Sequence, residues 1–232
     1  MPITIPLARI NRFLALAWIV LTLAGLGVEV AHYGFGQKSE LIRLLSLSEE
    51  GNIPTWYSSS VLLCCFLLLA LIAAMKKGAG GTFRGHWILL AVGFLYISMD
   101  DTAQIHENVN RLVDLHGIFY FTWVIPASIL VLGLALIFVR FVLHLPPRTR
   151  LRFLAAGVAF VGGKTVVEFV LGYWTDLHGD ENLTYAMIDL VEESLKILGS
   201  SMFLSALLEY IGTLARDLRV SIAAAPPAPG PS

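Results

Sequence analysis

Six long apolar runs constrain this chain more than any other feature of its sequence. Each run is close to the roughly 20 residues that an α-helix needs to cross the hydrocarbon core of a bilayer. We therefore predict an all-α integral membrane bundle of six transmembrane helices. The predicted spans lie near residues 13–35, 56–75, 87–109, 118–143, 151–174 and 185–214.

The composition favours a membrane protein. Of the 232 residues, 56% are hydrophobic and 14% are charged, whereas soluble domains carry roughly 25% charged residues. The expected partner is the lipid bilayer, and a formal net charge of −1 argues against nucleic acid. Cys64 and Cys65 are adjacent within an apolar run and lack the spacing of a metal site, so we interpret them as packing residues.

The distribution of Lys and Arg predicts the orientation of the chain. In a six-span topology, eleven basic residues fall on the side of both termini and three fall on the opposite side. Basic loops stay in the cytoplasm, so we predict cytoplasmic N- and C-termini in a multi-pass protein of the plasma (inner) membrane. The eleven residues are Arg9, Arg12, Lys76, Lys77, Arg84, Arg140, Arg148, Arg150, Arg152, Arg216 and Arg219, and the three are Lys38, Arg43 and Arg111.

The segments outside the spans complete the predicted domain. Residues 1–220 form a single six-helix domain, and the Ala/Pro-rich tail 221–232 is predicted to be disordered. Residues 39–48 alternate apolar side chains with Glu40, Arg43 and Ser46, which predicts a short helix in the membrane interface. Such a helix acts either as a lid over a site or, as we favour, as a plain connector.

Eight acidic residues interrupt the apolar runs. A charge at the middle of a spanning helix costs on the order of 2.5–3.5 kcal/mol, so these residues must pair, meet water or bind a ligand. The predicted topology places all eight at one depth, near the extracytoplasmic face. They are Glu29, Asp100, Asp101, Glu107, Glu168, Asp189, Glu192 and Glu193, and near them in sequence lie Lys164, Lys196, His32 and His106.

Helical spacing sorts these residues by face. The third predicted span carries its polar residues in one narrow stripe along the helix. His106 points away from this stripe unless the helix ends before residue 106. The stripe consists of Tyr96, Asp100, Gln104, Glu107 and Arg111. The corresponding sets are Asp189, Glu192, Glu193, Lys196 and Ser200 on the sixth span, and Lys164 and Glu168 on the fifth.

The charge balance suggests a bound ion. Two lysines, or three cations with Arg111, cannot neutralise eight carboxylates in a low dielectric, so some carboxylates hold protons or share a cation. Carboxylates with imidazole suit zinc, iron or manganese, and carboxylates alone suit calcium or magnesium. The predicted metal ligands are Asp100, Asp101, Glu107, Glu168, Asp189, Glu192 and Glu193, with Glu29, His32, Gln104, His106, Arg111 and Lys164 in support. The alternative is a structural network of helix-bracing ion pairs.

These residues predict an acid-rich intramembrane site, open to the extracytoplasmic side, that binds a cation or small polar ligand. One form of this function is a metal-dependent enzyme on a lipid or envelope substrate, with a divalent metal ion as cofactor. Its candidate catalytic residues are Asp100, Glu107, Glu193 and Lys196. The alternatives are a proton- or cation-coupled transporter and a non-catalytic membrane assembly subunit. The sequence lacks zinc-protease, nucleophile-elbow, P-loop and dinucleotide motifs, so it leaves open whether the protein is an enzyme.

Overall fold

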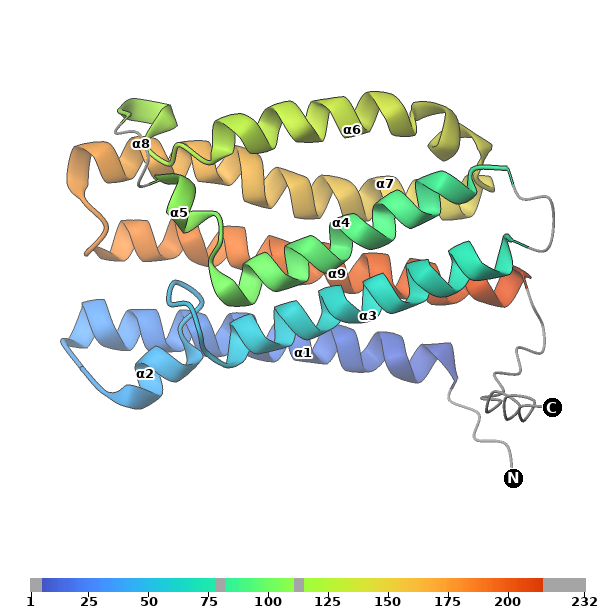
Figure 1. Cartoon of the computed structure of the whole chain (residues 1–232). Coiled ribbons are helices and arrows are strands. Elements are labelled where there is room, and N and C mark those ends of the chain that lie inside the picture. The colour runs from blue at the N-terminus through green and yellow to red at the C-terminus, as the bar shows by residue number, and fades with distance from the viewer. Residues whose placement is uncertain (1–5, 78–81, 111–114, 215–232) are drawn as a thin grey trace, which may run out of the picture.

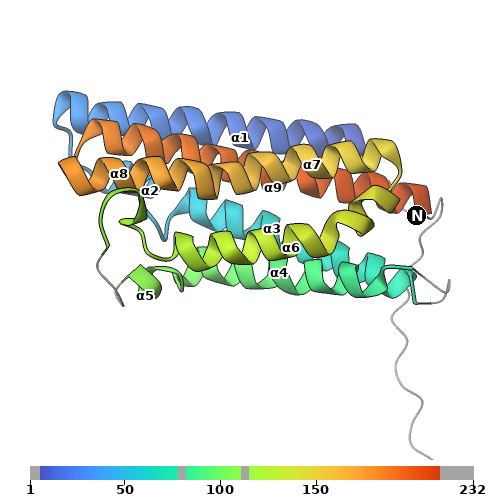
Figure 2. The same ribbon diagram turned by 90° about the horizontal axis from the view of Figure 1, so that it is seen from above.

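The computed structural model describes residues 6–77, 82–110 and 115–214, and within these ranges the chain forms helices and turns without a strand. The all-α prediction is confirmed. The long helices lie side by side with roughly parallel axes and form an elongated bundle (Figure 1, Figure 2). Helix α1 (Leu7–Glu29) begins and helix α9 (Leu183–Leu214) ends at the same end of this bundle, as both views show.

Five helical segments in the described ranges are long and apolar enough to cross a membrane. They contain between 21 and 32 residues, against the roughly 20 that a span requires. These segments are Leu7–Gly34, Ile53–Met75, Val124–His144, Pro147–His178 and Leu183–Leu214. Length and composition therefore suggest a membrane protein, and the five segments overlap five of the six predicted spans.

The remaining elements connect or extend these segments. The five candidate spans consist of the following elements: α1 with the π-helix η1 (Val30–Gly34), α3 (Ile53–Met75), α6 (Val124–His144), α7 (Pro147–Val161) with the π-helix η3 (Gly162–Val167) and α8 (Glu168–His178), and α9. The shorter elements are α2 (Glu40–Leu45), α4 (Arg84–Ala103), α5 (Glu107–Asn110) and the 3₁₀-helix η2 (Gly117–Phe119). Helix α3 begins where the side chain of Asn52 accepts the backbone N–H of Thr55, and α7 begins at Pro147, which suits a first helical turn.

The predicted span 87–109 differs most from the structure. Helix α4 begins earlier, at Arg84, and ends at Ala103, and it is not among the five segments that qualify as spans. Gln104 follows in a left-handed backbone conformation, with φ 52° and ψ 43°, and donates its N–H to the carbonyl of Asp100. Helix α4 therefore ends where the sequence predicted a continuous helix, and the predicted stripe is wrong at Gln104, which lies beyond the end of the helix; Arg111 lies outside the described residues.

The other predicted boundaries shift by less. Helix α6 begins at Val124 and not near 118, because residues 117–119 form the 3₁₀-helix η2. The predicted interfacial helix 39–48 is shorter in the structure, where α2 covers Glu40–Leu45. The predicted disordered tail 221–232 lies outside the described residues.

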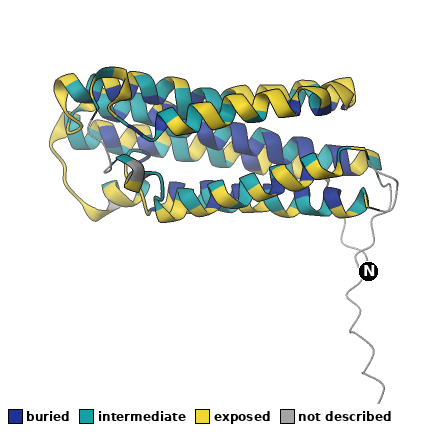
Figure 3. Ribbon diagram, turned by 45° about the horizontal axis from the view of Figure 1, so that its top comes forward, coloured by how far each residue is buried: buried dark blue, intermediate teal, exposed yellow. Residues whose placement is uncertain are grey.

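Helix α9 is the centre of the bundle. It contacts α1, α3, α7, η3 and α8. Half of its apolar stretch is buried, a larger share than in the other four segments that are long and apolar enough to cross a membrane. Buried residues concentrate along the inner faces of the helices, and the outer faces are largely exposed (Figure 3). The position of α9 means that its polar residues face several neighbours at once.

An aromatic cluster fills the half of the bundle where α9 ends. Trp87 stacks on Tyr210 with 5.1 Å between ring centroids and meets Phe141 edge-on at 4.8 Å. Phe153 and Phe203 lie 4.7 Å apart. All five rings belong to the main apolar core. Aromatic rings therefore pack against one another within the apolar core at this end.

Large apolar side chains also cover the outer surface. Leu136, Leu151 and Val158 are 70%, 70% and 73% exposed. Monomeric soluble proteins rarely expose wide apolar patches. Such a surface is compatible with contact to lipid chains.

Two of the candidate spans contain a π-helical stretch next to charged residues in the interior of the bundle. The π-helix η1 follows Glu29, and η3 contains Lys164 and leads into Glu168. Such π-segments are rare and occur frequently at functional sites. At η3 the absence of a side chain on Gly163 allows close approach to α9, because a Cβ there would lie 2.9 Å from that of Leu195. The site described next lies against this approach.

Candidate functional site

A polar cavity of about 370 Å³ lies at the end of the bundle where α9 begins, opposite the aromatic cluster. Its walls come from η3, α8 and the first half of α9 on one side, and from the loop after α2 and the turn after α4 on the other. The polar and charged residues that line it are Arg43, Ser48, Glu49, Glu50, Thr55, Gln104, His106, Lys164, Glu168, Tyr185, Asp189, Glu192, Glu193 and Lys196.

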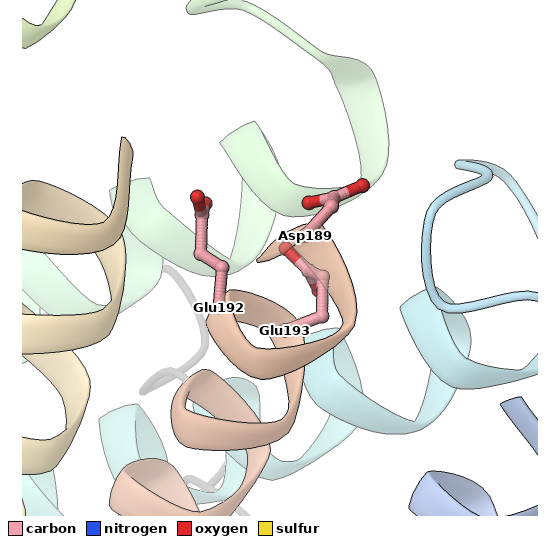
Figure 4. Close-up of side chains that lie close together, drawn as sticks. All are labelled: Asp189, Glu192 and Glu193. Carbon is pink, nitrogen blue, oxygen red and sulfur yellow. The ribbon is translucent and has the colours of Figure 1, made fainter. Parts of the chain in front are cut away.

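Three carboxylates of α9 form the acidic wall of this cavity. Asp189, Glu192 and Glu193 follow helical i, i+3, i+4 spacing, and their side chains extend to the same side of the helix (Figure 4). One oxygen of each lies within 4.8 Å of the others. Oxygen–cation bonds are about 2.0–2.6 Å long, so two ligands of one cation lie at most about 5 Å apart. The three oxygens are therefore close enough to bind a common cation.

Two lysines connect these carboxylates to neighbouring helices. The Nζ atom of Lys164 lies 2.7 Å from Glu192 Oε1 and 3.3 Å from Glu193 Oε1. Lys196 contacts the other oxygen of Glu193 and lies 2.7 Å from Asp101 Oδ1 on α4. Positive and negative groups thus alternate from Asp101 to Glu192 and link α4, α9 and η3.

The lysines leave part of the negative charge without a partner. Glu192 Oε2 and Asp101 Oδ2 are buried and have no hydrogen-bond partner among the described residues. Glu168 is also buried, and it accepts a hydrogen bond from Trp123 Nε1 at 3.1 Å. Buried polar atoms in native proteins nearly always have a partner. The two orphaned oxygens indicate that a water molecule, a proton or a cation completes this network.

The turn after α4 adds an imidazole to the cavity. Helix α4 ends before Gln104, which is left-handed, and His106 lies against Asp100. Asp100 accepts the backbone N–H of His106 at 2.8 Å and contacts its Nδ1 at 3.0 Å. The Nε2 atom of His106 lies 4.0 Å from Glu50 Oε1, and both residues line the cavity. Helical spacing predicts that His106 points away from the acidic stripe unless the third predicted span ends before it. Helix α4 does end before His106, at Ala103.

Glu29 and His32 belong to a second cavity beside the first. It has a volume of about 730 Å³ and shares Arg43, Ser48, Glu49 and Tyr185 with the first cavity. Glu29 is 2% exposed and accepts a hydrogen bond from the hydroxyl of Ser46. These two predicted supporting residues therefore lie at the same end of the bundle but not in the lining of the first cavity.

The structure brings together much of the predicted ligand set. The cavity lining includes four predicted metal ligands, Glu168, Asp189, Glu192 and Glu193. It also includes the predicted supporting residues Gln104, His106 and Lys164. Asp101 joins the network through Lys196, and Asp100 adjoins the cavity through His106. The side chain of Glu107 and the whole of Arg111 lie outside the described residues.

Sequence reasoning missed several polar residues of this cavity region, which are Trp123, Arg43, Glu50, Ser48, Glu49, Thr55 and Tyr185. Trp123 donates to Glu168, and Arg43 and Glu50 line the wall. Trp123 lies in an apolar stretch of sequence. The one signal for its role is that a buried indole N–H needs a hydrogen-bond acceptor. Glu50 lies in an irregular loop, to which helical spacing does not apply. Arg43 lies in the segment 39–48, for which the sequence favours a connector in the membrane interface over a lid.

Comparison with known proteins gives a family but no activity. No curated protein and no solved structure matches the chain. A family model described as a domain of unknown function matches residues 12–210, which include every residue that lines the acidic cavity. Because this match covers most of the chain, the protein belongs to the DUF8692 family.

Proposed function

We propose that this protein is a multi-pass membrane protein that binds a divalent cation in its acid-rich cavity. The observation that carries the proposal is the α9 carboxylate group. Its three ligand oxygens lie within 4.8 Å of one another, and Glu192 contributes a buried oxygen without a hydrogen-bond partner. A cation between these oxygens would offset their mutual repulsion and complete their coordination.

The charge of the cavity lining favours a cation over an anion. The cavity lining contains three Lys or Arg side chains and six Asp or Glu side chains. The basic residues are Arg43, Lys164 and Lys196, and the acidic residues are Glu49, Glu50, Glu168, Asp189, Glu192 and Glu193. Each lysine already contacts two carboxylates. A divalent cation reduces the remaining negative charge, whereas an anion increases it.

The aromatic end of the bundle favours a binding site with one opening over a transport path. Beyond Lys196, the buried residues of α9 carry no charge and are apolar or small apart from Tyr210. A coupled transporter needs polar groups on both sides of its site. In the topology we propose, the cavity opens to the extracytoplasmic side of the plasma membrane. There a metal-dependent enzyme could act on a lipid or envelope substrate, with Glu193 and Lys196 as its candidate reactive groups.

The competing account is a structural brace. Lys164 and Lys196 would then serve only to join α4, η3 and α9, and the protein would be an assembly subunit. The two accounts differ in whether the network needs a cation.

Cation binding by the purified full-length protein in detergent micelles tests the proposal. Protein purified without chelator would be subjected to elemental analysis, and chelated protein would be titrated calorimetrically with Zn²⁺, Mn²⁺, Mg²⁺ and Ca²⁺. We expect one bound divalent cation per chain in the wild type. Asp189→Asn and Glu192→Gln should each weaken binding at least about tenfold, which corresponds to about 1.4 kcal/mol.

Glu209→Gln is the matched control. Glu209 lies near the other end of α9, where it pairs with Arg152, so this variant should bind the cation like the wild type. A wild type that binds no divalent cation would overturn the proposal. If, in addition, the stability lost in Glu192→Gln returned in the Glu192→Gln/Lys164→Met double variant, the brace would be the better account.

A further inference from the structure

We infer that a groove between α1, α7 and α9, which opens towards the aromatic end of the bundle, binds an anionic glycerophospholipid. The phosphate would lie beside Arg152, and an acyl chain would lie against the apolar walls further in. The groove has a volume of about 390 Å³, and no described residue lines both it and the acid-rich cavity. The lipid site therefore does not require the proposed cation.

Helices α1 and α9 contribute matching faces to this groove. The α1 face consists of Asn11, Leu14, Ala15 and Trp18. The α9 face consists of Leu198, Ser201, Met202 and Ser205. Both sets follow i, i+3, i+4, i+7 spacing, which places their members on one side of a helix. Helix α9 contacts both α1 and α7, so it forms the floor of the groove between them (Figure 1).

The groove is polar at one end and apolar at the other. Helix α1 begins and α9 ends at the aromatic end, so Asn11 and Ser205 are the members of their faces nearest that end. Trp18 and Leu198 lie deepest. The indole N–H of Trp18 donates to the carbonyl and hydroxyl oxygens of Ser194, so its polar atom already has partners on α9. A ligand with a polar head and an apolar chain matches this arrangement.

Arg152 provides a positive charge at the polar end of the groove. It lies near the start of α7, lines the groove and pairs with Glu209 of α9. Arg148 approaches the same carboxylate, with 3.9 Å between Nη1 and Oε1. One carboxylate cannot neutralise two guanidinium groups, and a guanidinium has five N–H donors in a geometry that suits phosphate. The pair therefore retains positive charge for an anionic head.

The surrounding charge also selects an anionic lipid. Among the described residues, nine Lys or Arg side chains lie at the aromatic end, and Glu209 is the one acid there. Basic clusters of this kind attract anionic lipid headgroups. The nine residues are Arg9, Arg12, Lys76, Lys77, Arg84, Arg140, Arg148, Arg150 and Arg152. The acid-rich end of the bundle would instead repel such a headgroup.

One polar atom of the groove residues lacks a partner. The side-chain Oδ1 of Asn11 is buried and has no hydrogen-bond partner among the described residues. Buried polar atoms in native proteins nearly always have one. A glycerol headgroup carries hydroxyl groups that can donate to this amide once it turns towards the groove.

Two other occupants would use the same groove differently. A zwitterionic lipid would use the apolar walls without gaining from the net positive charge. A second copy of this chain would bury the groove in a dimer interface. Headgroup selectivity, the effect of filling the groove and the oligomeric mass separate these cases from an anionic lipid.

Native mass spectrometry of the delipidated full-length protein in detergent micelles tests the inference. The probes are dioleoyl phosphatidylglycerol and dioleoyl phosphatidylcholine, which have the same chains and differ in headgroup charge. We expect one phosphatidylglycerol per chain, bound at least about tenfold more tightly than phosphatidylcholine, as attraction to more than one basic side chain implies. Equal affinities for the two lipids would overturn the inference.

The contribution of Arg152 is tested by removing its competitor. Glu209→Gln frees the guanidinium and should strengthen phosphatidylglycerol binding by about three- to tenfold, with phosphatidylcholine binding unchanged. The double variant Arg152→Gln/Glu209→Gln leaves no unpaired carboxylate and should reduce the preference for phosphatidylglycerol to about threefold or less. If Arg152 serves only to pair with Glu209, neither change alters lipid binding, and the inference fails.

The contribution of the groove is tested by filling it. Ala15→Phe places a ring in the groove and should weaken phosphatidylglycerol binding at least about tenfold, because the acyl chain loses its apolar contact. The matched control is Leu16→Phe. Leu16 is 61% exposed and does not line the groove, so this variant should bind both lipids like the wild type. Thermal unfolding in lipid-free micelles identifies a variant that fails to fold, in which case Glu209→Gln carries the test.

Two further outcomes would overturn the inference. Full phosphatidylglycerol selectivity in Ala15→Phe would place the lipid on the basic surface and not in the groove. A dimer in lipid-free micelles that dissociates in Ala15→Phe would assign the groove to a second copy of the chain. Divalent cation binding should be unchanged in all of these variants, so the lipid site and the proposed cation site stand or fall separately.

Discussion

The two halves of α9 bury different chemistry within one continuous helix. From Asp189 to Lys196 its inner face presents carboxylates and an amine to α4 and η3. From Ile197 to Ile211 the inner face is apolar or small and packs into the aromatic core. The second half is held mainly by packing, with one ion-paired acid, Glu209, near its end. The polar half instead contains several buried charges, which are costly in a membrane helix.

The two ends should also differ in how they respond to a single substitution. An apolar core loses stability according to the volume removed. A buried ion network loses more when one member is removed, because its partners remain charged in a low dielectric. The predictions below use this contrast, beginning with the largest expected effect.

Lys196→Met should destabilise the polar end strongly. Its side chain is 6% exposed and contacts Asp101 and Glu193, so its loss removes the lysine that pairs with Asp101 and leaves Glu193 paired with Lys164 alone. We expect a loss of about 3–5 kcal/mol in the free energy of unfolding, measured by denaturation in detergent micelles. The control is Lys76→Met at the aromatic end, where the amine lies 5.7 Å from the centroid of the Tyr210 ring. That change should cost less than about 1 kcal/mol, and equal losses at the two ends would contradict the contrast.

Trp87→Leu should destabilise the aromatic end without affecting the cavity. Trp87 is 1% exposed and contacts Tyr210 and Phe141. Losing this ring should cost about 2–3 kcal/mol. Calorimetric titration of the variant should give a cation affinity within about twofold of the wild type, because the two ends are separate packing regions. A large fall in affinity would show that the aromatic core controls the site.

Thiol labelling should reveal which end faces the outside of the cell, with little effect on stability. In a variant in which Cys64 and Cys65 are replaced by alanine, single cysteines would be introduced near Gly78, Thr149, Asn52 and Gly179. An impermeant thiol reagent added to intact cells should label the positions near Asn52 and Gly179 and should not label those near Gly78 and Thr149. The reverse pattern would place the acid-rich cavity on the cytoplasmic side.

Helical spacing predicted the cavity well where the helix is regular. Helical spacing predicts one face of the sixth span for Asp189, Glu193 and Lys196. In the structure Glu193 contacts Lys164, Lys196 contacts Asp101, and Asp189 lies beside Glu193. This succeeded because α9 is unbroken from Leu183 to Leu214. A long regular helix converts sequence spacing directly into position in space.

The same reasoning failed at the end of α4. No glycine or proline marks the stop, and Gln104 adopts a left-handed conformation that glutamine seldom takes. The hydrogen bonds from Gln104 N–H to the Asp100 carbonyl and from His106 N–H to the Asp100 side chain stabilise the turn. Those contacts depend on three-dimensional structure, so spacing alone could not have placed His106 beside Asp100. The π-helix at Lys164 likewise has no marker in the sequence.

Anomalous X-ray diffraction from crystals of the wild-type protein grown with Zn²⁺ tests the central claim most directly. The account predicts an anomalous peak inside the acid-rich cavity, about 2.0–2.6 Å from carboxylate oxygens of Asp189, Glu192 or Glu193. A cavity without such a peak, in which water or the two lysines alone complete the carboxylate network, would contradict it.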